Sequence, residues 1–281
     1  MTSSGPGRRR RPRYGRRRGA VPVGHTLIAR LGPRGDELFA ALDDVDEEPV
    51  RLKPGPDTPL EEVRFVAIDC ETTGRTPHHI IELGAVAFTL ERHLMSFESL
   101  VHTSDRINPY ALRLHGISSQ TLGGAPPVEA VLERFRRLAQ GALLVEHSAD
   151  AFDTRLVART MREAFEADNV DTSRLAAKLW GLKETIGLER LCQELGVQNR
   201  RPHHALADAE ATAACFLALL REGRSRFGWD TVGALLADGQ PPPPRFPSRR
   251  QVARSSAGRR QRAPAGARGD PATDEGLVAN H

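Results

Sequence analysis

Five residues carry the chemistry that this sequence suggests: the carboxylates Asp69, Glu71, Asp153 and Asp208, and the imidazole of His203. They lie at the edges of predicted strands and helices, where folding can bring them together. Like charges gather at one point only where cations neutralise them, and carboxylate oxygens are ligands that suit Mg²⁺ and Mn²⁺. Carboxylates beside a histidine are the groups that hydrolysis of a phosphodiester by two metal ions requires.

The pair Asp69 and Glu71 follows the apolar run of residues 65–68. Residues two apart on a strand point to the same face of the sheet, so both carboxylates are expected side by side at the strand's end. The alternative is a pair of solvated strand acids, which the apolar run leading into them disfavours.

Asp153 is the third candidate acid, at the start of a predicted helix. Phe152 is expected to anchor it in the core, and residues 155–157 continue the helix. Asp150 competes for the same role. The plainer alternative for either acid is a helix cap.

His203 and Asp208 lie five residues apart at the start of a long predicted helix. Asp208 is expected in the first turns, facing the sheet, and His203 on the loop that leads into the helix. An imidazole, whose ordinary pKa lies near neutrality, can take a proton from an attacking water. His204 is expected to face solvent. The plainer alternative is that His203 caps the helix and that Asp208 is an acid on the surface.

The hydrophobic pattern predicts the elements that position these residues. Apolar runs predict strands, the first three as an antiparallel meander, at residues 64–69, 80–90, 93–102 and 142–146. Helical spacing and capping residues predict helices at 126–140, 150–165, from Asp171, at 188–195, and at 202–220 with an end near Gly223. This order indicates an α/β fold with a mixed sheet flanked by helices.

Composition and charge divide the chain into five segments. They are an Arg/Gly-rich tail (1–20), an acidic and partly ordered linker (21–62), the catalytic domain (63–223), a short helical extension (224–238) and a Pro/Arg-rich tail (239–281). Each tail carries eight arginines, against no acid in the first and three in the second, and both are expected to be disordered. Totals of 40 basic and 36 acidic residues then leave 24 and 33 between the tails. Cationic tails fit a polyanionic partner, or they are solvated chain with no target.

Cysteine usage and hydropathy bear on the compartment. Cys70, Cys192 and Cys215 have no paired spacing, so neither a disulfide framework nor a zinc site is indicated. No apolar run reaches the ~18 residues that span a bilayer, and the segment after the first arginines is too short and broken for a signal-peptide core. We expect a cytoplasmic protein, associated with the nucleoid if it meets DNA, and no membrane partner.

Residues 63–221 resemble the DnaQ-like family of 3′–5′ exonucleases, the type of the epsilon subunit of DNA polymerase III. Three motifs occur in the family's order: Asp-Cys-Glu-Thr-Thr-Gly from Asp69, Phe-Asp at 152–153, and His-His-Ala-Leu-Ala-Asp-Ala from His203. Further similar segments are Leu114–Ser118 and Asp171–Leu175. The family has a ribonuclease H-like fold and belongs to the class with four acids and a histidine.

The resemblance implies a role for each site residue. Two divalent cations, Mg²⁺ or Mn²⁺, would be held by Asp69, Glu71, Asp153 and Asp208, and His203 would deprotonate the attacking water. Thr72 and Thr73 follow at the position where the family holds the terminal nucleotide, and a simple Thr-Thr-Gly turn is the alternative. His115 lines the nucleotide pocket or is a buried structural histidine.

One loop departs from the family's pattern. The family has His-Asn-Ala-x-Phe-Asp, whereas this chain has His147-Ser-Ala-Asp-Ala-Phe-Asp153, without the asparagine and one residue longer. Substrate contacts around His147 are therefore in doubt.

The expected function is metal-dependent 3′–5′ hydrolysis of single-stranded DNA to nucleoside 5′-monophosphates, of the proofreading or repair type. A DNA polymerase would be a partner in trans, because the chain has no polymerase segment. Two alternatives stay open, since the same motifs occur in both. One is an exoribonuclease that trims RNA 3′ ends, and the other is a catalytically silent adaptor that binds nucleic acid.

Overall fold

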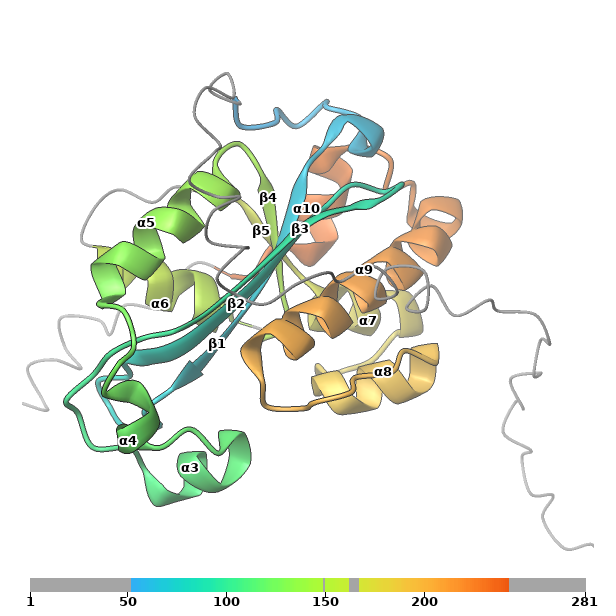
Figure 1. The fold of residues 1–281 in the computed structure, drawn as a ribbon. Helices are drawn as coiled ribbons and strands as arrows, with labels where there is room; N and C mark the ends of the chain where they lie inside the picture. Colours follow the sequence, from blue (N-terminus) through green and yellow to red (C-terminus); the bar gives the residue numbers. More distant parts are fainter. Residues whose placement is uncertain (1–51, 149, 162–166, 243–281) are drawn as a thin grey trace, which may run out of the picture. The chain divides into compact units, whose positions relative to one another are not determined.

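A computed structural model describes residues 52–148, 150–161 and 167–242 of the chain (Figure 1). Both predicted tails, apart from residues 239–242, and residues 21–51 of the predicted linker lie outside these ranges. The described residues form one five-stranded sheet in the order β3-β2-β1-β4-β5. Its strands are β1 (Phe65–Thr72), β2 (Ile80–Phe88), β3 (His93–Leu100), β4 (Leu143–Glu146) and β5 (Asn169–Asp171).

Helices connect and cover these strands. They are the 3₁₀ turn η1 (Leu60–Glu62), α3 (Pro109–His115), α4 (Ser119–Leu122), α5 (Val128–Ala139), α6 (Phe152–Met161), α7 (Thr172–Trp180), α8 (Leu188–Leu195), α9 (Ala205–Phe227) and α10 (Val232–Gly239). Within the described ranges, no helix is both long and apolar enough to cross a bilayer.

The sheet is mixed, as the sequence predicts. β1, β2 and β3 form the expected antiparallel meander, while β4 pairs in parallel with β1 and with β5. The strand β5 was not predicted, because three residues are too few to establish an alternating pattern. Its last residue, Asp171, caps α7 and accepts hydrogen bonds from the backbone N–H groups of Ser173 and Arg174, where the sequence allows either Asp171 or Thr172 as the cap.

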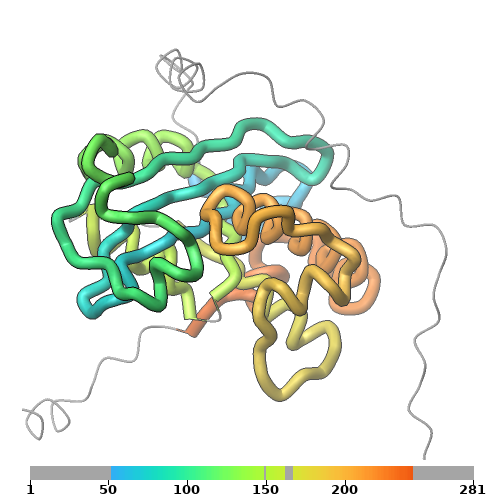
Figure 2. The backbone as a smooth tube through the Cα atoms, turned by 60° about the horizontal axis from the view of Figure 1, so that its bottom comes forward, coloured from blue at the N-terminus to red at the C-terminus, as the bar shows by residue number. Residues whose placement is uncertain are grey.

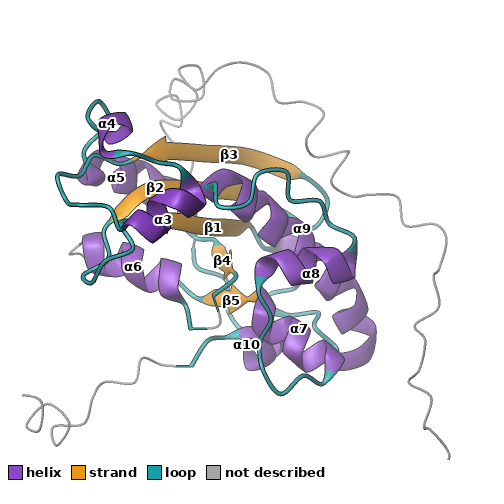
Figure 3. Cartoon of the chain, turned by 90° about the horizontal axis from the view of Figure 1, so that it is seen from below, coloured by secondary structure: helices purple, strands orange, loops and turns teal. Residues whose placement is uncertain are grey.

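Alternate residues of the central strand β1 build two different cores. Val66, Ile68 and Cys70 pack with α5 and α6, whereas Phe65 and Ala67 pack with α7, α9 and α10. Seen along the sheet, the two helix layers lie on opposite faces (Figure 3), and α9 (orange) runs beside the meander (blue to teal) in Figure 2. Continuing this alternation directs Asp69 and Glu71 toward the α9 face.

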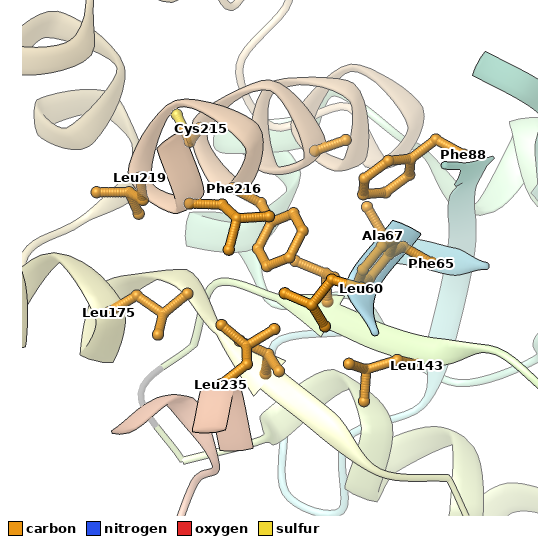
Figure 4. Close-up of a cluster of buried hydrophobic side chains, with 14 of the residues drawn as sticks. Leu60, Phe65, Ala67, Phe88, Leu143, Leu175, Cys215, Phe216, Leu219 and Leu235 are labelled. Carbon is orange, nitrogen blue, oxygen red and sulfur yellow. The ribbon is translucent and has the colours of Figure 1, made fainter. Parts of the chain in front are cut away.

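Aromatic packing fixes β1 and β2 against α9. The ring of Phe65 lies 5.4 Å from that of Phe88 and 5.0 Å from that of Phe216, measured between centroids. Figure 4 shows these rings together with Leu60, which is fully buried although it belongs to the predicted linker. The backbone N–H of Leu60 donates to the carbonyl of Asp230, 3.0 Å away, so residues just before β1 contact the turn that precedes α10.

α9 runs past its predicted end near Gly223 and stops at Gly228, which has the left-handed conformation of a helix C-cap. Gly223 has a different role, because a Cβ placed there would lie 1.8 Å from the indole ring of Trp229. The glycine therefore lets the buried tryptophan pack against the helix. Sequence alone does not separate this close contact from a helix stop.

Candidate active site

Asp69 and Glu71 lie at the end of β1, with their side chains on the same face of the sheet. Across the antiparallel ladder, Asp69 is paired with Gly84 and Glu71 with Glu82. The register then shifts between Glu71 and Thr72, where the strand begins to leave the sheet. The two predicted carboxylates thus stand where β1 ends, and Glu82 adds a third acid from β2.

Asp153 reaches the same strand from α6. Its Oδ1 accepts a hydrogen bond from the backbone N–H of Cys70, at 3.1 Å, and the residue is 6% exposed. Asp150 is exposed instead. This placement supports Asp153 over Asp150 as the third of the predicted acids. Ala151, just before α6, has a φ of 60°, so the chain turns sharply into the helix that carries Asp153.

The prediction that Phe152 anchors Asp153 in the core is wrong. Its side chain is 36% exposed, and its ring meets that of His78 edge to face at 5.3 Å. Leu156 and Val157, one turn later, are the buried anchors of α6. A helix that covers a sheet points only one side inward, and Asp153 faces the sheet while its neighbour faces solvent.

Asp208 and His203 come together at the start of α9. Oδ2 of Asp208 accepts a hydrogen bond from the backbone N–H of His203 at 2.9 Å, and its Oδ1 accepts one from the side chain of Asn199. His203 has a φ of 63°, a conformation that histidine tolerates better than most side chains. Single side-chain atoms of Glu71, His203 and Asp208 lie within 4.8 Å of one another. The structure therefore joins the first and third motifs directly.

The acids raise one another's pKa values. Burial, and then the charges of Asp153, Asp208 and Glu71, hold the pKa of Asp69 well above its ordinary range. Burial, and then the charge of Asp208, raises the pKa of Glu71 to about 8. For Asp153, burial raises the pKa to about 7, while hydrogen bonds from the backbone N–H groups of Cys70 and Asp153 oppose this shift.

This donor set fits a divalent cation. All of its side-chain donors besides the imidazole are carboxylates, and the pKa values of Asp69 and Glu71 are raised first by burial and then by the charges of the neighbouring acids. Hard oxygen donors of this kind suit divalent cations such as Mg²⁺ and Mn²⁺. The group Glu71, His203 and Asp208 can approach a single ion, and Asp69 and Asp153 lie beside it.

The predicted substrate residues are placed near the acids. Thr72 Oγ1 lies 3.3 Å from His78 Nδ1 and 3.2 Å from the backbone N of Gly74, while the buried hydroxyl of Thr73 accepts a hydrogen bond from the backbone of His79. His115 is partly buried, and its Nδ1 accepts a hydrogen bond from the backbone N–H of Ile117 at 3.0 Å. Thr73 and His115 thus each have a local structural role, and their nucleotide contacts stay predictions.

The longer loop after β4 is held by hydrogen bonds. His147 Nδ1 lies 2.8 Å from Thr172 Oγ1, and its Nε2 lies 2.9 Å from the carbonyl of Ile186. The backbone N–H of Ser148 donates to Asp171. His147 therefore joins the end of β4 to the start of α7. Both of its ring nitrogens already have protein partners, so the structure gives it no free group for substrate.

A second group of polar residues lies beside the site and was missed. His204, expected to face solvent, is instead partly buried, and its Nε2 lies 3.0 Å from a carboxylate oxygen of Glu98 and 3.7 Å from one of Glu82. Oε2 of Glu82 also accepts the backbone N–H of Ala205, the first residue of α9, at 2.9 Å. Glu82 could have been found, because it is the one charged residue in the apolar run of β2.

Gly84 on β2 lets α9 approach the sheet at this point. A Cβ at Gly84 would lie 2.2 Å from backbone atoms of Ala205 and Leu206. We expect Gly84→Ala to lower the free energy of unfolding by roughly 3 kcal/mol, because backbone and not a flexible side chain would have to move. Urea unfolding measures the change. Gly124→Ala is the matched control, since nothing lies within 4 Å of its Cβ position, and an equal effect of the two would contradict the explanation.

Comparisons with known proteins relate the chain to exonucleases. The RNase T family model, described as an exonuclease, matches residues 66–216, which is more than half of the chain. The DNA polymerase III subunit epsilon-like protein of Rhodobacter capsulatus is 34% identical over 192 residues. The 3′-5′ exonuclease DinG of Bacillus subtilis is 31% identical over 172 residues.

The relatives are much longer proteins. The first match covers 65% of this chain and 27% of the Rhodobacter protein, and the second covers 59% of this chain and 18% of the Bacillus protein. Among solved structures, E. coli exonuclease I in complex with a dT13 oligonucleotide has a TM-score of 0.52 at 16% identity. That match covers 60% of this chain and 43% of that one. The structural match confirms the ribonuclease H-like fold. By the family model, this chain belongs to the RNase T family of exonucleases, and the names of its relatives agree with the predicted resemblance to DnaQ-like enzymes.

Proposed function

We propose that the protein is a metal-dependent 3′–5′ exonuclease that shortens single-stranded DNA and releases nucleoside 5′-monophosphates. The observation that carries this proposal is the convergence of Asp69, Glu71, Asp153, Asp208 and His203 at the end of β1. Family membership supports hydrolysis by an exonuclease, and the cluster of acids supports a site that can hold the metal ions for this reaction.

Two divalent cations, Mg²⁺ or Mn²⁺, are the proposed cofactors. Asp69, Glu71, Asp153 and Asp208 would hold them, since four carboxylates supply the charge that two such ions balance. The ions would supply Lewis-acid chemistry, offsetting the charge on the scissile phosphate and on the leaving oxygen.

His203 acts as the general base. Its imidazole takes a proton from the attacking water, whose oxygen forms a bond to the terminal phosphorus. The bond between that phosphorus and the 3′-oxygen of the preceding nucleotide breaks, and the 3′-oxygen takes up a proton. The products are a nucleoside 5′-monophosphate and a strand one nucleotide shorter. The hydrogen bond from the backbone of His203 to Asp208 keeps the imidazole beside the acids.

DNA is the proposed substrate over RNA. Several relatives bear names of DNA polymerase III components, including the PolC-type enzymes of Caldanaerobacter and Thermotoga at 32% identity. A DNA polymerase acting in trans is accordingly the proposed partner. A DNA substrate also favours the cytoplasm, as the sequence predicts.

Digestion of single-stranded DNA and RNA of identical sequence tests the proposal. Each strand carries a 5′ label and is incubated with Mn²⁺ or with a chelator. A Mn²⁺-dependent ladder that shortens from the 3′ end is expected, faster on DNA. A faster RNA ladder would replace the substrate assignment. Intact strands that shift on a native gel would instead identify a binding adaptor.

The role of His203 has its own test. We expect His203→Asn to lower kcat by roughly 100- to 10,000-fold, the range for a lost general base. Asparagine also tolerates a positive φ, so the backbone at this position is preserved. His93→Asn is the matched control, since that partly buried histidine begins β3 beside the turn between β2 and β3. An equal loss of kcat in both variants would show that His203 is not the general base.

A further inference from the structure

The helix α3 is unusual because none of its residues is buried. Tyr110 is 63% exposed, Leu112 37% and Leu114 42%. In the described part of the chain, five large hydrophobic side chains are exposed, and the remaining two are Phe152 and Leu52. Tyr110 and Leu114 are four residues apart and therefore lie on the same side of the helix, and exposed apolar side chains that lie together mark binding surfaces.

α3 is fastened to the end of β1, directly after the catalytic acids. The backbone N–H of Asn108 donates to the carbonyl of Thr73 at 2.8 Å, and its side-chain amide donates to the carbonyl of Gly74 at 3.1 Å. Gly74 also lies against Ala111, since a Cβ there would be 2.7 Å from the methyl group of Ala111. Figures 1 and 3 show α3 beside the end of β1.

The surroundings of α3 carry positive charge. Arg75, Arg106 and Arg113 are all exposed, and among the described residues none of the three has an ion-pair partner within 4.0 Å. The guanidinium of Arg113 lies 5.7 Å from the centroid of the Tyr110 ring. The nearby Asp105 is paired with His79 at 2.7 Å. Single-stranded nucleic acid offers matching groups for both features, since its phosphates pair with guanidinium groups and its bases stack on aromatic rings.

We propose that α3 is the surface over which the single strand reaches the active site, with the Tyr110 ring stacked on a nucleobase upstream of the scissile bond. Arg113 and its neighbours contact the phosphates of the same stretch. This inference rests on the proposed exonuclease function. It adds a location for the nucleotides that precede the terminal one in the strand. Base stacking on an aromatic ring tolerates any sequence, as a trimming enzyme requires.

The test compares a long substrate with a minimal one. Parent and Tyr110→Ala proteins are assayed with a single-stranded oligonucleotide and with the p-nitrophenyl ester of thymidine 5′-monophosphate, which has no upstream nucleotide. We expect Tyr110→Ala to lower the ratio of kcat/KM for the oligonucleotide to that for the ester by about tenfold, mostly through KM. Tyr110→Phe keeps the ring and should keep the ratio.

Two further variants sharpen the result. Leu52→Ala is the control for removing an exposed hydrophobic side chain, because Leu52 precedes β1 while α3 follows its end. Arg113→Gln should reduce the slope of log K against log salt for oligonucleotide binding by about 0.7, the value for one lost phosphate contact. Arg92→Gln, in the turn between β2 and β3, should leave that slope unchanged.

The outcomes separate the two proposals. A parent that cleaves neither substrate overturns the exonuclease function, and oligonucleotide binding by fluorescence anisotropy then decides the role of α3. Weaker binding by Tyr110→Ala supports the stacking surface. Equal ratios and equal binding for parent and Tyr110→Ala overturn it, and would leave a protein partner as the occupant of α3.

Discussion

Asp69→Asn is expected to abolish turnover and, at the same time, to raise the melting temperature of the metal-free protein. Removing one of the four proposed metal ligands should lower kcat by roughly a thousandfold or more, since such a ligand accounts for several kcal/mol of transition-state stabilisation. Burial and the neighbouring carboxylates disfavour the charge on Asp69, so its loss relieves repulsion. A gain of about 5 °C at pH 8 in chelator is the expected size.

The two effects are measured on the same preparations, by initial rates with Mn²⁺ and by thermal unfolding with chelator. Mn²⁺ should raise the melting temperature of the parent and have little effect on Asp69→Asn, because the variant has lost a ligand. Asp57→Asn is the matched control, since Asp57 is an exposed acid in the segment before β1. Equal turnover by Asp69→Asn and the parent would contradict the proposal that Asp69 is a metal ligand.

Without metal, the protein is expected to become less stable as the pH rises from about 4.5 to 8. The pKa of Glu71 is raised to about 8 and that of Asp153 to about 7, so the folded state binds more protons than the unfolded state in this window. The free energy of unfolding therefore falls as the pH rises. The stabilisation that these two groups contribute is fully present below their pKa values in the unfolded state, and it is lost as the pH rises through their pKa values in the folded state. For Glu71 alone, the change corresponds to roughly 4 kcal/mol.

Divalent cations should reverse this pH dependence, because metal binds the deprotonated carboxylates. Urea unfolding at pH 5 and pH 8, with chelator and with Mn²⁺, measures both slopes. Glu71→Gln should flatten the slope in chelator, whereas Glu91→Gln, at the exposed turn after β2, should leave it as in the parent. A metal-free protein that gains stability from pH 5 to pH 8 would show that the acids are not crowded.

The sequence predicts the fold best where one pattern of residues determines both the type of secondary structure and which side chains are buried. The apolar run of β1 indicates the strand, and the two-residue spacing of Asp69 and Glu71 indicates that they share a face. The periodicity of α9 indicates the helix that carries Asp208. Because both patterns concern residues near in sequence, they need no knowledge of tertiary contacts.

The errors occur where a contact between distant residues decides. Gly223 resembles a helix stop, but Trp229 requires it as a packing surface. Phe152 resembles a core residue, but only one side of α6 faces the sheet, and Asp153 occupies that side. His204 resembles a surface residue, and its partners Glu82 and Glu98 come from strands more than a hundred residues earlier. None of these contacts has a local signature.

The centre at the end of β1 draws its acids from an early strand, a middle helix and the last long helix. A chain still under synthesis therefore holds Asp69 and Glu71 long before Asp208 and His203 exist to join them. If the proposed metal site needs all four carboxylates, a chain interrupted before His203 and Asp208 would not cut the nucleic acids around it. The order of the motifs would thus delay the proposed activity until the start of α9 has been synthesised.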